Sequence, residues 1–281
     1  MLSFPPSRRG TLTTPDGLQL HTQCWQPPTA PKGIVLAVHG YAEHCERLAE
    51  VAQACVDEQA TVYTYDQRGY GRSGGRRAYV DAFEDYLDDL ALVLTHVRTQ
   101  HPDRPLFLFG HSMGGLVVLK YVLDRSPDLR GLLLSAPALE VNPDLAPLLR
   151  RIAQQLGRLC PTLPTVRSPE GALSRDPAVV ADAENDPLNY HGGIRARTGA
   201  ELLRAGAAVR DRLHEVQTPF LIFHGTADTL ASPKWSRALH ERARAADKTI
   251  HLYDGLYHET FHEPEQADVL ADLGAWLRAR L

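Results

Sequence analysis

The amino-acid sequence predicts an α/β protein with a mostly parallel sheet and helices on both of its faces. Short apolar runs alternate with helix-like stretches along most of the 281 residues, as they do in chains that form parallel sheets. One apolar run, 105–109, leads through a Gly-x-Ser-x-Gly turn into a helix-like stretch. This arrangement presents a serine hydroxyl above the end of a parallel sheet.

Seven strands are predicted from the apolar pattern. Residues 17–25 alternate apolar and polar side chains as a half-buried strand does, whereas 33–38 is continuously apolar, which indicates burial on both faces. Similar runs follow at 61–65, 105–109, 131–135, 220–223 and 249–253. Helices are predicted at 46–60, 82–100, 112–125, 233–246 and 265–280.

The alternation is interrupted between residues 137 and 217, where prolines are frequent and no convincing strand occurs. We therefore assign 1–136 and 218–281 to the core and 137–217 to a helical cap. Within this insertion, apolar residues lie at helical spacing opposite arginines and glutamines: Leu145, Leu148, Leu149, Ile152, Leu156 and Leu159. Three roles remain open for this stripe, which are packing on the core, lining an acyl pocket and contacting lipid.

Composition excludes several classes of function. The formal net charge of −4, with both signs mixed along the chain, argues against a nucleic-acid partner. No segment approaches the length of a membrane-spanning helix and no signal-peptide core is recognisable, so we expect a soluble, cytoplasmic protein. The four cysteines lack metal-binding spacing, and no phosphate loop or dinucleotide fingerprint occurs; we expect reduced thiols, no metal and no cofactor.

Two serines match the Gly-x-Ser-x-Gly pattern. Ser112 follows the buried run 105–109 and precedes a helix-like stretch, whereas Ser73 lies among the glycines of 69–75. Such glycine density is typical of a loop. We therefore predict that Ser112 is the nucleophile and that Ser73 is a turn residue.

A nucleophilic serine needs a base and an acid that orients the base. We select His258 because it follows the last predicted strand closely, with His262 as the main competitor. We select Asp228 as the acid because it follows the run 220–227, whereas Glu140 and Asp254 are less well placed. Polar residues at the carboxyl ends of parallel strands meet at one edge of the sheet.

The tetrahedral intermediate formed by a nucleophilic serine also needs hydrogen-bond donors for its oxyanion. One is expected from the residue after the nucleophile, Met113, and another from the loop after the strand 33–38. In that loop we select the backbone N–H of Tyr41, because Gly40 lets the chain turn before it.

With these residues assembled, the chain resembles the monoacylglycerol lipases of the α/β-hydrolase superfamily. The resemblance covers nearly the whole chain. In the core it is carried by His39-Gly40-Tyr41-Ala42-Glu43-His44 with Arg47, by 65–75, by Gly110-His111-Ser112-Met113-Gly114-Gly115, by 219–230 and by 253–259. In the predicted cap it is carried by Leu173-Ser174-Arg175-Asp176 with Asp186-Pro187-Leu188. The serine motif is shared by many hydrolases of this fold. Its combination with the first segment and the cap segments is more selective.

The resemblance implies an α/β-hydrolase fold with an eight-stranded, mostly parallel sheet, and hydrolysis of a monoacylglycerol to glycerol and a fatty acid through an acyl-enzyme. It carries the triad onto Ser112, Asp228 and His258, and the oxyanion amides onto Tyr41 and Met113. It also places Glu43 and Arg47 near the glycerol end of the pocket. From the cap stripe we add Leu148, Leu149 and Ile152 as candidate contacts of the acyl chain. Tyr41-Ala42 departs from the Ala-Gly of mammalian relatives, which leaves the acyl preference open.

Other functions remain compatible with the sequence. A broader carboxylesterase or a lysophospholipase would use the same triad, and so would a proline iminopeptidase, which recognises a free amino terminus through acids in its cap. Candidate acids for that role are Glu170, Asp176, Asp182, Glu184 and Asp186. A hydrolase with an aspartate nucleophile is excluded by Ser112, and a non-enzymatic receptor is disfavoured by the complete triad. The expected partner is a lipid ester, with peripheral membrane contact through the cap; the sequence does not indicate an oligomeric state.

Overall fold

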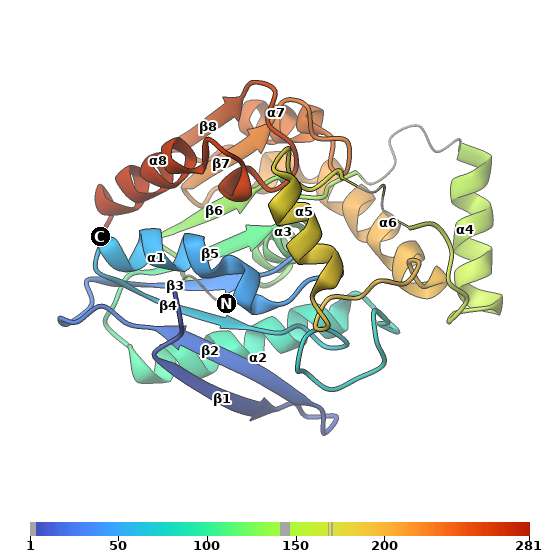
Figure 1. Cartoon of the computed structure of the whole chain (residues 1–281), viewed down its shortest axis with the longest axis horizontal. Helices are drawn as coiled ribbons and strands as arrows, with labels where there is room; N and C mark the ends of the chain where they lie inside the picture. Colours follow the sequence, from blue (N-terminus) through green and yellow to red (C-terminus); the bar gives the residue numbers. More distant parts are fainter. Residues whose placement is uncertain (1–3, 141–146, 168, 170) are drawn as a thin grey trace.

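An eight-stranded sheet forms the centre of the molecule (Figure 1). The computed structural model describes residues 4–140, 147–167, 169 and 171–281. The strand order is β1-β2-β4-β3-β5-β6-β7-β8, in which β2 runs antiparallel to both of its neighbours, β1 and β4, and the strands from β4 to β8 along this order pair in parallel. The strands are β1 (Arg8–Thr13), β2 (Gln19–Trp25), β3 (Gly33–Val38), β4 (Ala60–Tyr65), β5 (Leu106–His111), β6 (Gly131–Ser135), β7 (Phe220–Gly225) and β8 (Lys248–Tyr253). The predicted fold class is confirmed.

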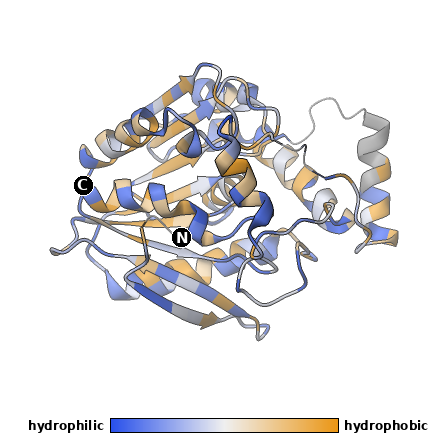
Figure 2. Cartoon of the chain, in the orientation of Figure 1, coloured by the Kyte–Doolittle hydropathy of each residue, from blue (hydrophilic) through white to orange (hydrophobic). Residues whose placement is uncertain are grey.

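Helices cover both faces of this sheet (Figure 1). Helices α1 (Ala49–Asp57) and α8 (Gln266–Arg278) pack on one face, and α2 (Glu84–Gln100), α3 (Met113–Arg125) and α7 (Pro233–Arg242) pack on the other. Alternate residues of a strand point to opposite faces, so in β3 Leu36 joins one core cluster and Val35 joins the other. This double burial explains why the central strands are continuously apolar, as their colouring in Figure 2 shows.

Strand β1 was missing from the prediction based on apolar runs. It is an edge strand that pairs only with β2 in the described sheet, and five of its six residues are exposed. A strand that buries almost nothing carries no apolar pattern, so periodicity could not find it.

Two predicted helices differ from the observed ones. The predicted helix 46–60 is divided into the 3₁₀ turn η1 (Cys45–Leu48) and the shorter helix α1. Helix α7 ends at Arg242 because Ala243 adopts an extended conformation and Arg244 N–H donates to Val216 O at 2.9 Å. This bond to a distant segment ends the helix before the predicted residue 246.

Between β6 and β7 the described residues form helices and contribute no strand to the sheet. The helices are α4 (Pro147–Leu159), α5 (Pro177–Asn185) and α6 (Ala196–Asp211), followed by the 3₁₀ turn η2 (Leu213–Glu215). Helix α6 packs on the core through Leu202 and Val209. Helix α4 lies against α6 at the end of the molecule away from the C-terminus (Figure 1). A Cβ on Gly157 of α4 would lie 2.8 Å from the Ala200 Cβ, so glycine permits the close approach of these two helices.

None of the helices in the described part of the chain has the length and apolar character needed to cross a lipid bilayer.

Candidate active site

The predicted site residues gather at one edge of the sheet. Strands β3, β5, β7 and β8 are parallel, so their carboxyl ends lie on the same side. Tyr41, Ser112, Asp228 and His258 each follow one of these four strands. This edge is where open parallel sheets bind ligands.

Ser112 occupies a sharp turn between β5 and α3. Its backbone has φ 50° and ψ −117°, a conformation that costs roughly 1–3 kcal/mol and occurs mainly at functional sites. The turn needs glycine at position 114, because a Cβ there would collide with the carbonyl oxygens of Val38 and His39. The turn is also held by Ser112 N–H, which donates to Ser135 O at 2.9 Å.

Ser73 has a different environment. Its hydroxyl donates to the carbonyl of Asp66 at 2.5 Å and accepts from His21 N–H at 2.8 Å. Through these two hydrogen bonds, the buried hydroxyl holds the loop 66–75 against β2. This geometry favours Ser112 as the nucleophile.

Asp228 lies at the centre of a buried hydrogen-bond network. Its Oδ1 accepts from Leu230 N–H at 2.7 Å and Ala231 N–H at 3.0 Å, while Oδ2 lies 2.7 Å from His258 Nδ1 and 2.9 Å from His224 Nε2. Burial opposes ionisation of this carboxyl, but His258 and the imidazole hydrogen bonds outweigh burial and hold its pKa well below the ordinary value. Asp228 is therefore a carboxylate that orients His258.

His258 is positioned as a base beside the serine turn. Its ring centroid lies 4.8 Å from that of His111, the residue before Ser112. Because Nδ1 faces Asp228, the other ring nitrogen, Nε2, is left for the serine. Burial alone would lower the pKa of His258, but the Asp228 carboxylate outweighs it and raises this pKa above 6.5.

His262 has both ring nitrogens engaged elsewhere. Nδ1 lies 2.7 Å from Glu259 Oε2 and Nε2 lies 3.1 Å from Glu50 Oε2. Burial disfavours the charged ring, but these two carboxylates raise the pKa of His262 to about 9. A protonated imidazole between two carboxylates cannot accept a serine proton, so the geometry favours His258 over this competitor.

The loop after β3 lies against the nucleophile. A Cβ on Gly40 would be 3.1 Å from the Ser112 Cβ. His39 holds this loop: its Nε2 accepts from Gln67 N–H at 2.9 Å, which leaves Nδ1 to donate to Gly40 O at 2.8 Å. Burial lowers the pKa of His39 to about 4, so the ring is neutral. Since C=O and N–H of one trans peptide point in opposite directions, this bond sets the direction of Tyr41 N–H.

Met113 supplies the other expected oxyanion donor. It is the first residue of α3, and the first amides of a helix have no intrahelical acceptor. The helix dipole adds a partial positive charge at this end. An anion that forms beside Ser112 would therefore meet an N–H group and a favourable potential.

Comparisons with known proteins show which family the chain belongs to. The sequence model of the family described as serine aminopeptidase, S33, matches residues 29–265. The chain is 36% identical over 265 residues to a monoacylglycerol lipase of Mycolicibacterium smegmatis, covering 94% of this chain and 95% of that one. A caffeoylshikimate esterase of Arabidopsis thaliana is 34% identical over 278 residues, covering 94% and 83%. The crystal structure of the Paleococcus ferrophilus monoacylglycerol lipase superposes with a TM-score of 0.84 at 29% identity, covering 93% and 99%.

The chain belongs to the monoacylglycerol lipase family. This membership confirms the resemblance inferred from the sequence motifs and the α/β-hydrolase fold. It also makes the chain a carboxylic ester hydrolase of the serine type.

In this family member, the predicted glycerol-end residues Glu43 and Arg47 are both buried. Arg47 Nη2 lies 2.5 Å from Glu259 Oε2, and Arg47 Nε lies 3.4 Å from Glu43 Oε2. Burial and the charge of Glu259 raise the pKa of Glu43 against the opposing effect of Arg47. Burial opposes ionisation of Glu259 as well, but Arg47 and His262 lower its pKa. Arg47 is thus neutralised mainly by Glu259.

The predicted acyl contacts lie in α4. The side chains of Leu148 and Leu149 are outside the described part of the chain, and Ile152 is 51% exposed. Contact of these three residues with an acyl chain stays a prediction.

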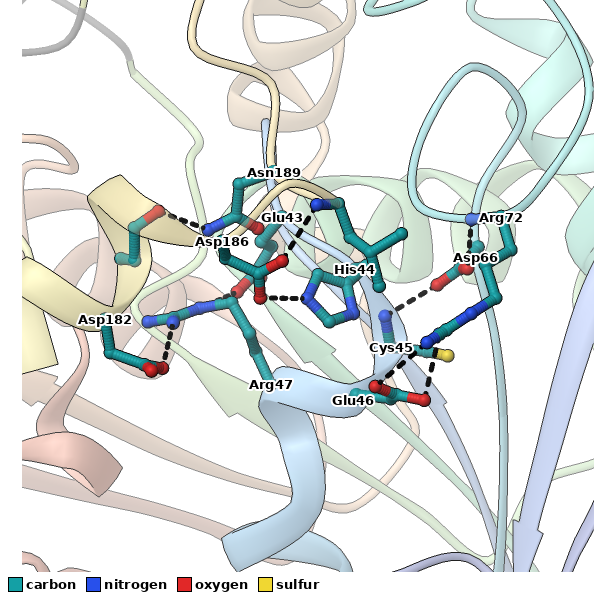
Figure 3. Close-up of polar contacts among 12 residues, drawn as sticks. Glu43, His44, Cys45, Glu46, Arg47, Asp66, Arg72, Asp182, Asp186 and Asn189 are labelled. Atoms are coloured by element: carbon teal, nitrogen blue, oxygen red, sulfur yellow. Dashed lines mark hydrogen bonds and ion pairs between the residues drawn. The ribbon is translucent and has the colours of Figure 1, made fainter. Parts of the chain in front are cut away.

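Polar contacts between the loop after β3 and the segment around α5 were not anticipated from the sequence (Figure 3). His44 Nε2 lies 2.8 Å from Asp186 Oδ2, and Arg47 Nη1 lies 4.0 Å from Asp182 Oδ2. Tyr190 N–H donates to Ala42 O at 2.8 Å. The segment Asp186-Pro187-Leu188 carried part of the family resemblance, but its partner, 142 residues earlier, could not be read from the pattern.

His224 was also missed. It lies in β7 and contacts Asp228 and Ser236, its Nδ1 being 2.7 Å from Ser236 Oγ. The sequence shows that His224 lies four residues before Asp228. A histidine inside an apolar strand does not by itself indicate a contact with the site.

Two clusters in the described chain combine residues that are able to ligate a metal. They are His21, Cys45 and Asp66, and Glu43, His111 and Glu259. In the first, both carboxylate oxygens of Asp66 already accept backbone N–H groups, at 2.8 Å and 2.7 Å, and burial raises the pKa of the Cys45 thiol. In the second, the Arg47 guanidinium already occupies the position of a cation. We assign no metal to either cluster.

Replacing Ser112 with alanine should lower kcat by at least about three decades, because the remaining catalysis comes only from binding and the oxyanion donors. Ser73→Ala serves as the matched control and should keep most of the activity, at a cost of about 1 kcal/mol in stability for its lost hydrogen bonds. Steady-state kinetics on a soluble ester and thermal melting measure both effects. An inactive Ser73→Ala protein that melts like the wild type would contradict the choice between the two serines.

The pH dependence of kcat/KM should report His258. Activity requires the neutral ring, so kcat/KM should rise with pH and have its midpoint above 6.5, since Asp228 raises this pKa. In Asp228→Asn the carboxylate is lost and burial dominates, so the midpoint should move to lower pH while kcat falls roughly 10³- to 10⁴-fold. An active His258→Ala enzyme together with an inactive His262→Ala enzyme would assign the base to His262 instead.

Proposed function

We propose that this protein hydrolyses monoacylglycerols to glycerol and a fatty acid through an acyl-enzyme on Ser112. The observation that carries the proposal is the buried Asp228–His258 pair beside the strained Ser112 turn, in a chain that matches a monoacylglycerol lipase over 94% of its length. The triad geometry supports the chemistry, and the family relationship supports the substrate.

In the proposed reaction, His258 Nε2 takes the Ser112 proton while Oγ attacks the ester carbonyl. The N–H groups of Tyr41 and Met113 stabilise the resulting oxyanion. The tetrahedral intermediate then collapses, the ester C–O bond breaks, and His258 gives its proton to the departing glycerol oxygen. A water molecule, deprotonated by His258, attacks the acyl-enzyme and releases the fatty acid with regeneration of Ser112.

Residues 137–217 are proposed to form the cap over this site. The support comes from bonds that join this segment to two catalytic loops. Glu259 N–H, next to His258, donates to Leu173 O at 2.8 Å, and Tyr190 N–H donates to Ala42 O in the loop of Tyr41. These bonds support a position of the segment 173–190 beside the proposed site.

Peripheral contact with membranes or lipid droplets is proposed for the outer part of this cap. Among the described side chains of α4 and the segment after it, four large apolar ones are exposed: Ile152, Leu159, Leu163 and Val166, with exposures of 51%, 80%, 45% and 56%. Apolar residues gathered on one exposed segment are typical of an interaction surface. A substrate that resides in lipid would be reached through such a surface.

The peptidase alternative is less well supported. An iminopeptidase needs carboxylates that are free to bind an amino terminus, but here Asp186 pairs with His44, and Asp176 Oδ1 caps α5 by accepting Ala178 N–H at 2.8 Å. Asp182 lies 4.0 Å from Arg47 with its side chain 80% exposed, Glu184 is exposed, and Glu170 lies outside the described residues. A broader carboxylesterase or lysophospholipase is compatible with the same triad.

Monoolein should be hydrolysed with a kcat/KM at least about tenfold above that for triolein, since a site that the proposed cap closes around one acyl chain would exclude the other two. The same assay should include four further kinds of substrate: medium to long monoacylglycerols, p-nitrophenyl butyrate, a lysophospholipid and a prolyl amide. Comparable rates on monoolein and emulsified triolein would contradict the proposal and indicate a true lipase. Activity confined to butyryl esters would favour the carboxylesterase alternative.

The double substitution of Leu159 and Val166 by serine should weaken binding to phosphatidylcholine vesicles by about tenfold or more, because each fully buried side chain of this size contributes about 1.5–3 kcal/mol. Sedimentation with vesicles measures the binding. Hydrolysis of soluble p-nitrophenyl butyrate should not change, which controls for folding. Unchanged vesicle binding by this variant would exclude the surface.

A further inference from the structure

Glu43 lies in the loop that carries one proposed oxyanion donor, and its carboxylate is bonded to that loop. Gly40 N–H donates to Glu43 Oε1 within this buried turn. The next amide along the chain is Tyr41 N–H. Glu43 therefore contacts the backbone directly before the proposed donor.

The turn is packed between Glu43 and the nucleophile. A Cβ on Gly40 would lie 2.7 Å from Glu43 Oε1 on one side and 3.1 Å from the Ser112 Cβ on the other. Gly40 O is held by His39 Nδ1, so both backbone polar groups of Gly40 have a side-chain partner. At Ala42 the loop also adopts φ 68°, which costs a non-glycine residue free energy. A strained turn of this kind keeps its shape only where its neighbours hold it.

Glu43 is itself held in place. Its side chain is 7% exposed, and Oε2 faces Arg47 Nε at 3.4 Å one helical turn later. Arg47 is fixed by Glu259, the residue after His258, and lies next to the cap residue Asp182 (Figure 3). The contacts Gly40–Glu43–Arg47–Glu259 thus connect the loop of the oxyanion donor with the loop of the catalytic base.

We propose that Glu43 is a positioning residue for ester hydrolysis, which acts through Gly40 N–H to hold Tyr41 N–H over Ser112. This inference rests on the proposed role of Tyr41 N–H as an oxyanion donor. The acceptor oxygen of Glu43 is the feature that matters, and contact with the substrate is not required. Because the oxyanion exists only in the transition state and the intermediates, loss of this acceptor should lower kcat and leave KM nearly unchanged.

Three variants test the proposal. Glu43→Met keeps the side-chain volume but removes the acceptor, and should lower kcat on p-nitrophenyl butyrate about 10²- to 10³-fold, the range for loss of one oxyanion donor, with KM within about threefold. Glu43→Gln keeps an oxygen that accepts Gly40 N–H and should retain kcat within about fivefold. Glu46→Ala is the matched control, since Glu46 lies three residues later, in η1, but pairs with Arg9 and Arg72, and it should behave like the wild type.

A second readout separates positioning from general damage. A trifluoromethyl ketone forms a tetrahedral oxyanion on Ser112, so its inhibition constant should rise in Glu43→Met by about the factor lost from kcat. An ether analogue of monoolein, which forms no oxyanion, should bind this variant as it binds the wild type. A crystal structure of the wild-type ketone adduct should show Tyr41 N–H on the oxyanion and Gly40 N–H on Glu43, and this measurement does not depend on whether the variants fold.

Specific results would overturn the inference. A wild-type kcat in Glu43→Met would remove the positioning role, and so would a raised KM with unchanged kcat, which would indicate substrate contact. Equal losses in Glu43→Gln and Glu43→Met would mean that the charge beside Arg47 matters instead of the acceptor. In all three cases an inactive Ser112→Ala enzyme leaves the proposed function standing, whereas an active Ser112→Ala enzyme would refute that function itself.

Discussion

The site depends on how closely the turn at Ser112 approaches the end of β3. Gly114 at the start of α3 lies against the carbonyl groups of Val38 and His39, where no side chain fits. This contact lets the chain turn sharply at Ser112, at φ 50°, and it sets the loop after β3 beside Ser112. The proposed roles of Ser112 and the Tyr41 amide both depend on this approach.

Buried charge is the second constraint on this molecule. An isolated carboxylate at the site of Asp228 would be too costly to ionise, but four hydrogen bonds and the neighbouring imidazole make the charged form the stable one. The Arg47 cluster follows the same rule, because its guanidinium lies between Glu43 and Glu259. Removing one member of such a group leaves its partners unpaired, so these charges also fix the loops that carry them.

The segment around α5 is bonded to the loops that follow β3 and β8. Leu173 O accepts an N–H from the loop of His258, and Ala42 O, near Tyr41, accepts one from Tyr190. Helix α4, in contrast, lies against α6 at the periphery and exposes apolar side chains. The described residues between β6 and β7 therefore combine a part bonded to these two loops with a part that presents apolar surface outward.

The sequence by itself determined the parallel sheet and the candidate residues at its edge. Strands buried on both faces must be continuously apolar, and the residues after them are local in the chain, so pattern and position were sufficient. Tertiary structure alone decided which groups meet. It adds β1 as an exposed edge strand and bonds the Ser73 hydroxyl to Asp66 and His21. It also places both ring nitrogens of His262 against carboxylates and lets Glu43 accept a hydrogen bond from Gly40 N–H. Two of these contacts join residues distant in the chain, Ser73 with His21 and His262 with Glu50. Two others join residues only three positions apart, His262 with Glu259 and Glu43 with Gly40. Neither kind imposes a periodicity that a sequence displays.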